Sequence, residues 1–294
     1  PCGGPMLGTD PPESTYGSDR NGLVWAYRFA RDQPARPVDA AEVVSQLTAR
    51  ASADTFLWLH FAVSNVASER FMREHLSLPD IFYEMMKEGA GSTRLEQDES
   101  RLIAQLHDVL FASRLDDSSA SSVSVCLEPG LLVTARRRPL RSIDRLRASV
   151  KSGQPFRTST DLLGRLLREQ ADVLAQVVRD ASARVDGIED QLLSERVTAS
   201  RRELGQLRRT LVRLQRLLAP EPAALFRLLN RPPSWIADDD LQDLRQAAEE
   251  FSVSVGVTYT LYALDYAGNT TLKTIMITTA PTFDPVSDIT IDED

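Results

Sequence analysis

The chain has 294 residues, of which 42% are hydrophobic and 26% charged, as is ordinary for one large globular domain or two smaller ones. The formal net charge is −8, and the last 44 residues hold six acidic residues against one lysine, so the preceding part is close to neutral. A near-neutral body argues against nucleic-acid binding, which needs a basic face. No apolar run approaches the roughly 20 residues that cross a bilayer, so we expect no membrane insertion by this chain.

The first part of the chain predicts a mixed sheet with flanking helices. Residues 1–21 are rich in Pro, Gly, Ser and Asp and predict a disordered leader, and residues 22–157 predict the α/β sheet subdomain. Strands are expected at 23–29, 55–63, 123–127 and 131–135, and helices at 38–50 and 67–87 with a break at Pro79. The segment 101–111 fits a strand or a helix.

Residues 158–251 predict a subdomain of long helices. Apolar side chains recur every three or four residues from Leu163, which predicts a helix of about 39 residues. The spacing of Ser200 and Glu203 is that of a capping box and predicts the start of the next helix. Two long helices joined by a short turn are expected to pack as an antiparallel hairpin.

Prolines divide the end of this helical part. Pro220 and Pro222 interrupt the second long helix, and a short helix is expected to resume at Ala223. The last helix is expected from Asp238 to about Phe251. The fold class is therefore α+β, a mixed sheet with flanking helices followed by long antiparallel helices.

The tail at 252–294 has a different composition from the rest. The preceding part is rich in arginine, whereas the tail has none and alternates Thr, Tyr, Val and Ile around Gly268-Asn269. We interpret it as an unrelated β-type tail fused to the rest.

Acidic residues at the expected start of the last helix are the candidate ligand set. Asp238, Asp239 and Asp240 suit a divalent cation, Zn²⁺ included, but they also suit an acidic helix N-terminus. Both interpretations stay open at this stage.

Other chemistry-bearing residues give weaker signals. The histidines, His60, His75 and His107, have no second His or Cys at ligand spacing, and a core role is favoured for His60. No nucleophile elbow or phosphate loop is present, so we expect no enzymatic activity and no organic cofactor. A basic run could contact phosphate, anionic lipid or an acidic neighbouring subunit, but a solvated helix start is favoured; its members are Arg136, Arg137, Arg138, Arg141, Arg145 and Arg147.

Six segments carry a resemblance to a known family. They are FLWLHF at 56–61, SLPDIFYEMM at 77–86, VCLEPGLLVTARRRPL at 125–140, VVRDASARVDGIEDQLL at 177–193, LRRTLVRLQRLLAPEPAALFRLL at 207–229 and PSWIADDDLQDLRQAAEE at 233–250. With them the chain resembles the cytosolic domain of CorA-like divalent-metal transporters of the ZntB zinc-transporting type. TLYALDYAGNTT at 260–271 resembles strands of bacterial immunoglobulin-like repeats.

The family resemblance implies a function and an assembly. It implies a homopentamer at the cytoplasmic face of the inner membrane that senses Zn²⁺ or another divalent cation and gates transport. Family members continue the last cytosolic helix into a membrane helix ending in Gly-Met-Asn, a motif that this sequence lacks, so we expect it to lack the pore. The alternative is a structural or interaction module that uses its helical hairpin and has no metal role.

Overall fold

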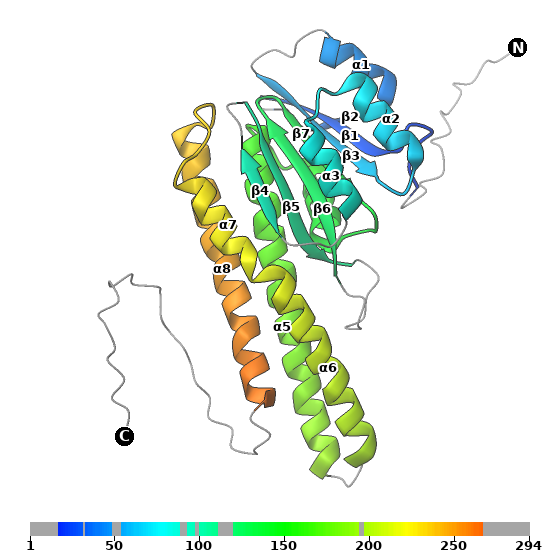
Figure 1. The fold of residues 1–294 in the computed structure, drawn as a ribbon. Coiled ribbons are helices and arrows are strands. Elements are labelled where there is room, and N and C mark those ends of the chain that lie inside the picture. Colours follow the sequence, from blue (N-terminus) through cyan, green and yellow to red (C-terminus); the bar gives the residue numbers. More distant parts are fainter. Residues whose placement is uncertain are drawn as a thin grey trace, which may run out of the picture.

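The structure, a computed structural model, describes residues 17–31, 33–48, 54–88, 93–97, 100–110, 120–193 and 197–266. Within these residues, seven strands form one sheet in the order β2-β1-β3-β7-β6-β5-β4 (Figure 1). The strands are β1 (Leu23–Ala30), β2 (Arg36–Pro37), β3 (Thr55–Ala62), β4 (Arg94–Gln97), β5 (Leu102–Val109), β6 (Ala120–Glu128) and β7 (Leu131–Arg136). Neighbouring strands are antiparallel except β3 and β7, which run parallel.

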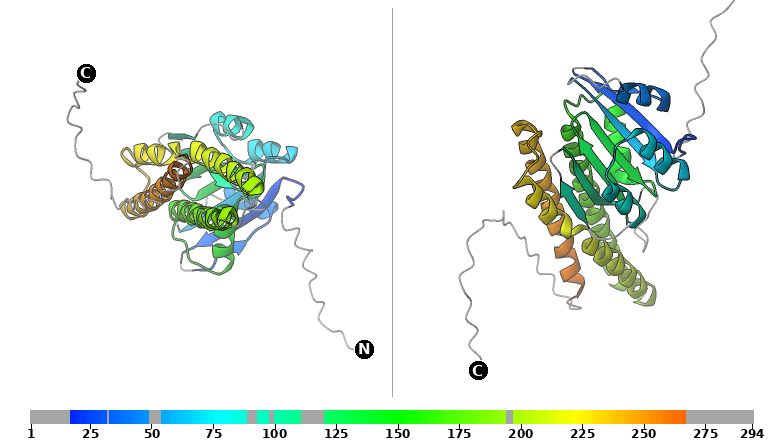
Figure 2. Two further views of the ribbon diagram at one scale, coloured as in Figure 1. Left: turned by 90° about the horizontal axis from the view of Figure 1, so that it is seen from below. Right: turned by 45° about the horizontal axis from the view of Figure 1, so that its top comes forward.

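Helices cover both faces of this sheet, as Figures 1 and 2 show. One face packs against α1 (Ala40–Thr48), α2 (Val66–His75) and α3 (Asp80–Glu88). The other packs against α4 (Arg141–Lys151), α5 (Ser159–Leu193), α7 (Pro220–Leu229) and α8 (Asp238–Tyr266). α5 and α6 (Val197–Leu218) lie side by side and extend beyond the sheet as an arm. The predicted α+β arrangement is confirmed.

The central strands form where the sequence is apolar without interruption. β3 is buried along nearly its whole length because helices cover both of its faces, and Trp58 and Leu59 are fully buried. The hairpin between β6 and β7 turns at Gly130, whose φ of +81° favours glycine. The ambiguous segment 101–111 forms strand β5, and Pro79 separates α2 from α3 as predicted.

Three predicted boundaries are wrong. α6 begins at Val197, which places Ser200 inside the helix rather than at its cap, and α7 begins at Pro220 because proline fits the first helical position. α8 continues to Tyr266, beyond the predicted end at Phe251. Extending an existing helix fixes only one residue at a time, so the strand-favouring Val, Thr and Tyr residues remain helical.

The two ends of the chain were predicted to be irregular or β-type. Residues 1–16 and 267–294 lie outside the described residues, and with them most of the predicted leader and the predicted strand turn at Gly268. Residues 18–21 are ordered by Asp19, whose carboxylate accepts the backbone N–H groups of Asn21 and Leu23, both at 2.8 Å.

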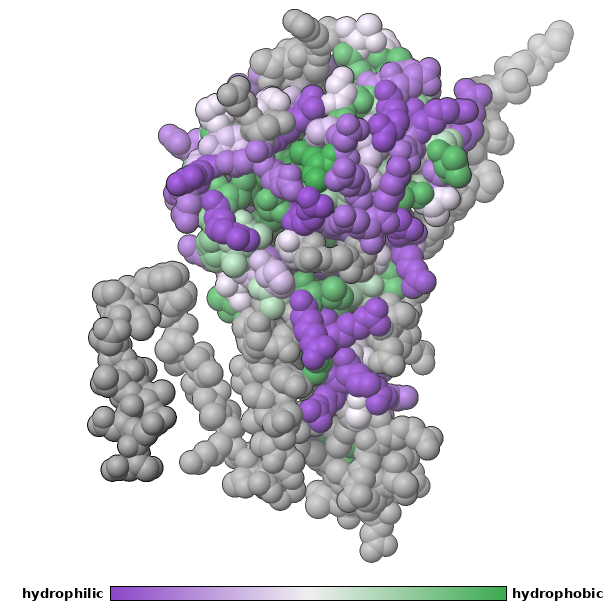
Figure 3. Space-filling model, viewed as in Figure 1, coloured by the Kyte–Doolittle hydropathy of each residue, from purple (hydrophilic) through white to green (hydrophobic). Residues whose placement is uncertain are grey.

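The apolar residues are packed against the two faces of the sheet, and few large ones are left on the surface. On the face drawn in Figure 3, hydrophilic residues cover most of the described surface. Among the described residues the exposed large hydrophobic side chains are those of Val66 and Val253. No helix in this part of the chain is long and apolar enough to cross a membrane.

Candidate functional site

The acidic run at the start of α8 is divided between solvent and the interior. Asp238 and Asp239 are exposed, whereas Asp240 is only 5% exposed. The hydroxyl of Thr158 donates to Oδ2 of Asp240 at 2.7 Å and accepts the backbone N–H of Asp161. Asp240 therefore ties the first turn of α8 to the first turn of α5.

This geometry does not assemble a metal centre within one chain. Among the described residues, no group of three or more His, Cys, Asp or Glu side chains is placed to hold a metal ion. A guanidinium nitrogen of Arg157 lies 3.4 Å from Asp243 and 4.0 Å from Asp240, so a basic group already faces the run. Cation binding by Asp238, Asp239 and Asp240 stays a prediction.

His60 is a hydrogen-bonded core residue, as the sequence favoured. Nε of Arg136 donates to its Nε2 at 2.7 Å, and its Nδ1 lies 2.7 Å from the hydroxyl of Thr134. Arginine only donates, so Nε2 must be the bare nitrogen and Nδ1 must carry the proton. Burial, with the nearby charges of Arg136 and Arg147, lowers the pKa of His60 well below its usual value. The imidazole is therefore held neutral.

The basic run is divided: Arg138 and Arg145 are exposed at the start of α4, in line with a solvated helix start, whereas other members are engaged with the fold. Besides Arg136, which is 4% exposed, Arg137 donates to the carbonyls of Met86 and Lys87 at the end of α3. Arg141 donates to the carbonyl of Leu110. The run fixes loops and helix ends because free carbonyls there accept hydrogen bonds from guanidinium groups.

His75 lies apart from the other two histidines. It is half-buried on α2, with its ring 4.7 Å from that of Phe71 and its Nε2 3.9 Å from a carboxylate oxygen of Glu74. It lines a cavity of about 210 Å³ between α1 and α2, beside Arg20 and Arg70.

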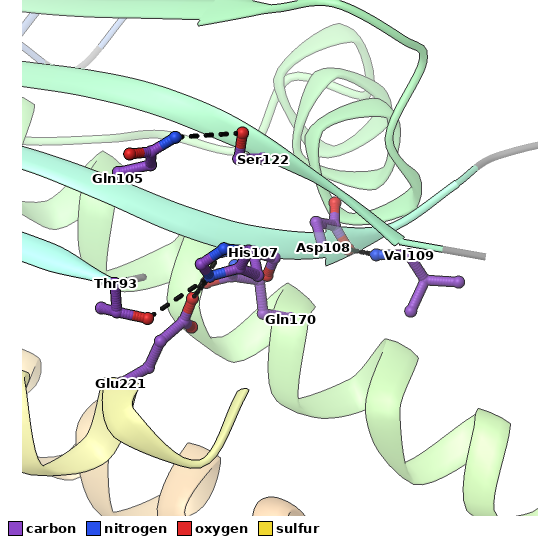
Figure 4. A network of polar contacts seen from close by, with 8 residues as sticks. All are labelled: Thr93, Gln105, His107, Asp108, Val109, Ser122, Gln170 and Glu221. Carbon is purple, nitrogen blue, oxygen red and sulfur yellow. Dashed lines mark hydrogen bonds and ion pairs between the residues drawn. The ribbon is translucent and has the colours of Figure 1, made fainter. Parts of the chain in front are cut away.

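A buried polar network joins β5 to three helices, and Figure 4 shows its contacts with α5 and α7. We call it the β5–α7 network, and its members are Thr93, His107, Asp108, Ser142, Gln170 and Glu221. Oε1 of Glu221 accepts the backbone N–H of His107 and lies 2.9 Å from its Nδ1. The amide of Gln170 on α5 donates to the backbone carbonyl of His107 at 2.8 Å.

The neighbouring Asp108 holds the start of α4. One carboxylate oxygen accepts the backbone N–H of Ser142 at 3.0 Å and also its hydroxyl, and the other accepts the N–H of Val109 at 2.6 Å. Asp108 is 3% exposed, and burial, only partly offset by these hydrogen bonds, raises its pKa to about 7. Burial likewise raises the pKa of Glu221, which is fully buried, despite its contact with His107.

Sequence reasoning missed this network. Asp108 lies in none of the segments singled out in the sequence, Glu221 lies in the segment 207–229 with no role assigned, and His107 and Glu221 are 114 positions apart. The available signal was a glutamate directly after Pro220 in a helix that is apolar apart from it and Arg227. That signal marks a buried acid without revealing its partner.

Comparisons with known proteins agree with this fold. The family model described as CorA-like Mg²⁺ transporter protein matches residues 53–264. The zinc transport protein ZntB of Pectobacterium atrosepticum is 22% identical over 229 residues, which cover 78% of this chain and 68% of that relative.

Two solved structures share the fold. The full-length CmaX protein superposes with a TM-score of 0.74 at 19% identity, over 85% of this chain and 76% of that one. The ZntB cytoplasmic domain from Vibrio parahaemolyticus superposes with a TM-score of 0.63 at 10% identity, over 84% and 96%. The family match spans the sheet from β3 onward and the long helices through most of α8. The chain therefore belongs to the family of CorA-like Mg²⁺ transporter proteins.

Proposed function

We propose that this chain is the sensing and gating domain of a divalent-cation transporter of the zinc-transporting type, and that it lies at the cytoplasmic face of the inner membrane. The observation that carries this proposal is the family match over residues 53–264. The similarity to zinc transport proteins supports zinc as the cation.

The domain would act by repositioning helices rather than by bond chemistry. α8 packs along α5, and Asp240 and Thr158 connect their first turns. A cation held by the exposed carboxylates of Asp238 and Asp239 would compete with Arg157 for the acidic run. It shifts the helices only if it binds one arrangement more tightly than the other. Carboxylates suit Mg²⁺ as well as Zn²⁺, although zinc prefers nitrogen and sulfur ligands.

We further propose a homopentamer, in line with the family resemblance. The acidic run of one chain offers too few convergent ligands for a closed site. A neighbouring copy would supply the remaining ligands, which would couple cation binding to assembly.

Light scattering on the full chain with and without Zn²⁺ or Mg²⁺, together with thermal unfolding, tests the proposal. We expect a cation-dependent increase in mass towards a pentamer and a higher melting temperature, both weakened by the double change Asp238→Asn with Asp239→Asn. The matched control changes Asp172 and Asp186, exposed acids on α5, to Asn. If neither cation shifts mass or melting, the chain is a structural or interaction module instead.

A further inference from the structure

Side chains of α7 and α5 bind the backbone of β5 just beyond the pairing of β5 with β4. β4 pairs with β5 only as far as Gln105, opposite Arg94. Two residues on, the backbone N–H of His107 donates to the carboxyl of Glu221, and its carbonyl accepts from Gln170. Side chains of α7 and α5 thus hydrogen-bond both backbone groups of His107, and Figure 4 shows Glu221 and Gln170 beside it.

The position of Glu221 lets this contact influence the orientation of the helical arm formed by α5 and α6. Pro220 is the first residue of α7 and follows directly on the last turns of α6, so Glu221 lies at the corner between the two helices. Holding this corner against β5 fixes the direction in which α6 leaves the sheet. Releasing it would free α6 and α7 to change their angle to the sheet.

Two buried carboxyl groups converge on this end of β5. Glu221 on α7 faces His107, and Asp108 on β5 faces the start of α4. Thr93, Ser142 and Gln170, which also hydrogen-bond to these residues, do not titrate. Repulsion between the carboxylates of Glu221 and Asp108 adds to the cost of burying Asp108 in its charged form.

We propose that Glu221 and Asp108 form a proton-operated latch that holds the α6–α7 corner and the start of α4 on the end of β5. Burial favours the protonated form of both carboxyl groups in the closed latch. Loss of these protons leaves two like charges buried at the same end of β5, and water then competes for them. The latch tightens in acid and loosens as pH rises through neutrality, which makes the domain responsive to pH independently of any cation.

Hydrogen exchange of the full chain, followed by mass spectrometry at pH 6 and pH 8.5 and corrected for intrinsic exchange rates, tests the latch. We expect peptides covering 102–110 and 220–229 to lose about tenfold in protection at the higher pH. Peptides from β3 should keep theirs. Glu221→Gln retains an acceptor for the His107 N–H but cannot ionise, so it should abolish most of this loss.

Glu169→Gln is the matched control. Glu169 is a buried acid on α5 that pairs with Arg165 and is outside the latch, so the variant should behave like the wild type. Equal protection of the wild type at both pH values overturns the proposal, whether or not the Glu221 variant folds. The proposal is also overturned if Glu221→Gln loses as much protection between pH 6 and pH 8.5 as the wild type does.

Discussion

Arg136 donates from Nε to Nε2 of His60, and this one hydrogen bond determines which nitrogen of the imidazole carries the proton. His60 then donates from Nδ1 to Thr134, which also accepts from the indole N–H of Trp58 at 2.9 Å. The Thr134 hydroxyl in turn donates a hydrogen bond to the carbonyl of Leu59 at 3.3 Å. The centre of the sheet thus contains a directed chain of hydrogen bonds with every proton assigned.

Thr134→Val should be destabilising although it preserves shape. It leaves two buried donors without an acceptor, on Trp58 and His60, and each costs about 1–3 kcal/mol. Thr210→Val is the matched control, because the buried Thr210 hydroxyl has no hydrogen-bond partner among the described residues. Urea unfolding should show a large decrease in the free energy of unfolding for Thr134→Val and little or none for Thr210→Val. Equal losses would contradict the assignment.

Asp108→Asn should flatten the dependence of stability on pH. Burial raises the pKa of Asp108 from 3.8 to about 7, so between these values the folded chain retains a proton that the unfolded chain releases. The free energy of unfolding therefore falls as pH rises through this window. Urea unfolding should show that the free energy of unfolding differs less between pH 5 and pH 8 in Asp108→Asn than in the wild type. Asp239→Asn, which changes an exposed acid, should keep the wild-type difference, and an unchanged slope in Asp108→Asn would refute the prediction.

Asp240→Asn should weaken the link between α8 and α5. The change removes the charge from the acceptor of the Thr158 hydroxyl, and such hydrogen bonds to charged groups contribute about 1.5–3 kcal/mol. Asp238→Asn in the same turn is exposed and should stay within about 0.5 kcal/mol of the wild type. Thermal unfolding of the two variants separates a structural role of Asp240 from a general effect of acidic charge at the helix start. Similar melting temperatures would favour the latter.

Gly22→Ala should disturb the packing of α2 against the segment that contains Gly22. A Cβ atom at this position would lie 1.9 Å from Oγ and 2.8 Å from Cα of Ser68, so the helix backbone itself would have to move. Gly153 has a similar positive φ of +83° with nothing within 4 Å of the added atom, so Gly153→Ala isolates the conformational cost of about 1 kcal/mol. Urea unfolding should show a distinctly larger decrease in the free energy of unfolding for Gly22→Ala than for Gly153→Ala. If both variants lose the same amount, the close contact with Ser68 is not a constraint.

The sequence was most informative where a single local signal dominates. The apolar run of β3 and the Glu-Pro-Gly turn before β7 predicted the centre of the sheet, because burial and turn geometry there depend on neighbouring residues. The end of α8 was missed because strand propensity is a weak preference that helix extension overrides.

The candidate sites were harder to predict than the fold. Asp238, Asp239 and Asp240 were visible as a run, but only the structure distinguishes the buried Asp240 from its exposed neighbours. The contact between His107 and Glu221 depends on how α7 packs against the sheet. A single sequence gives no information on that packing. Side-chain contacts across such separations follow from the fold rather than from local pattern.

The single parallel pair in the sheet has a consequence for how the protein folds. β3 and β7 meet with Trp58 opposite Leu132, whereas β5, β6 and β7 follow each other as neighbours in the chain. The closure of long loops is slower than that of short ones, so we expect the β5–β6–β7 meander and the β1–β3 pair to assemble first. The parallel contact between β3 and β7 in the middle of the sheet would then form last, joining two parts that had already assembled.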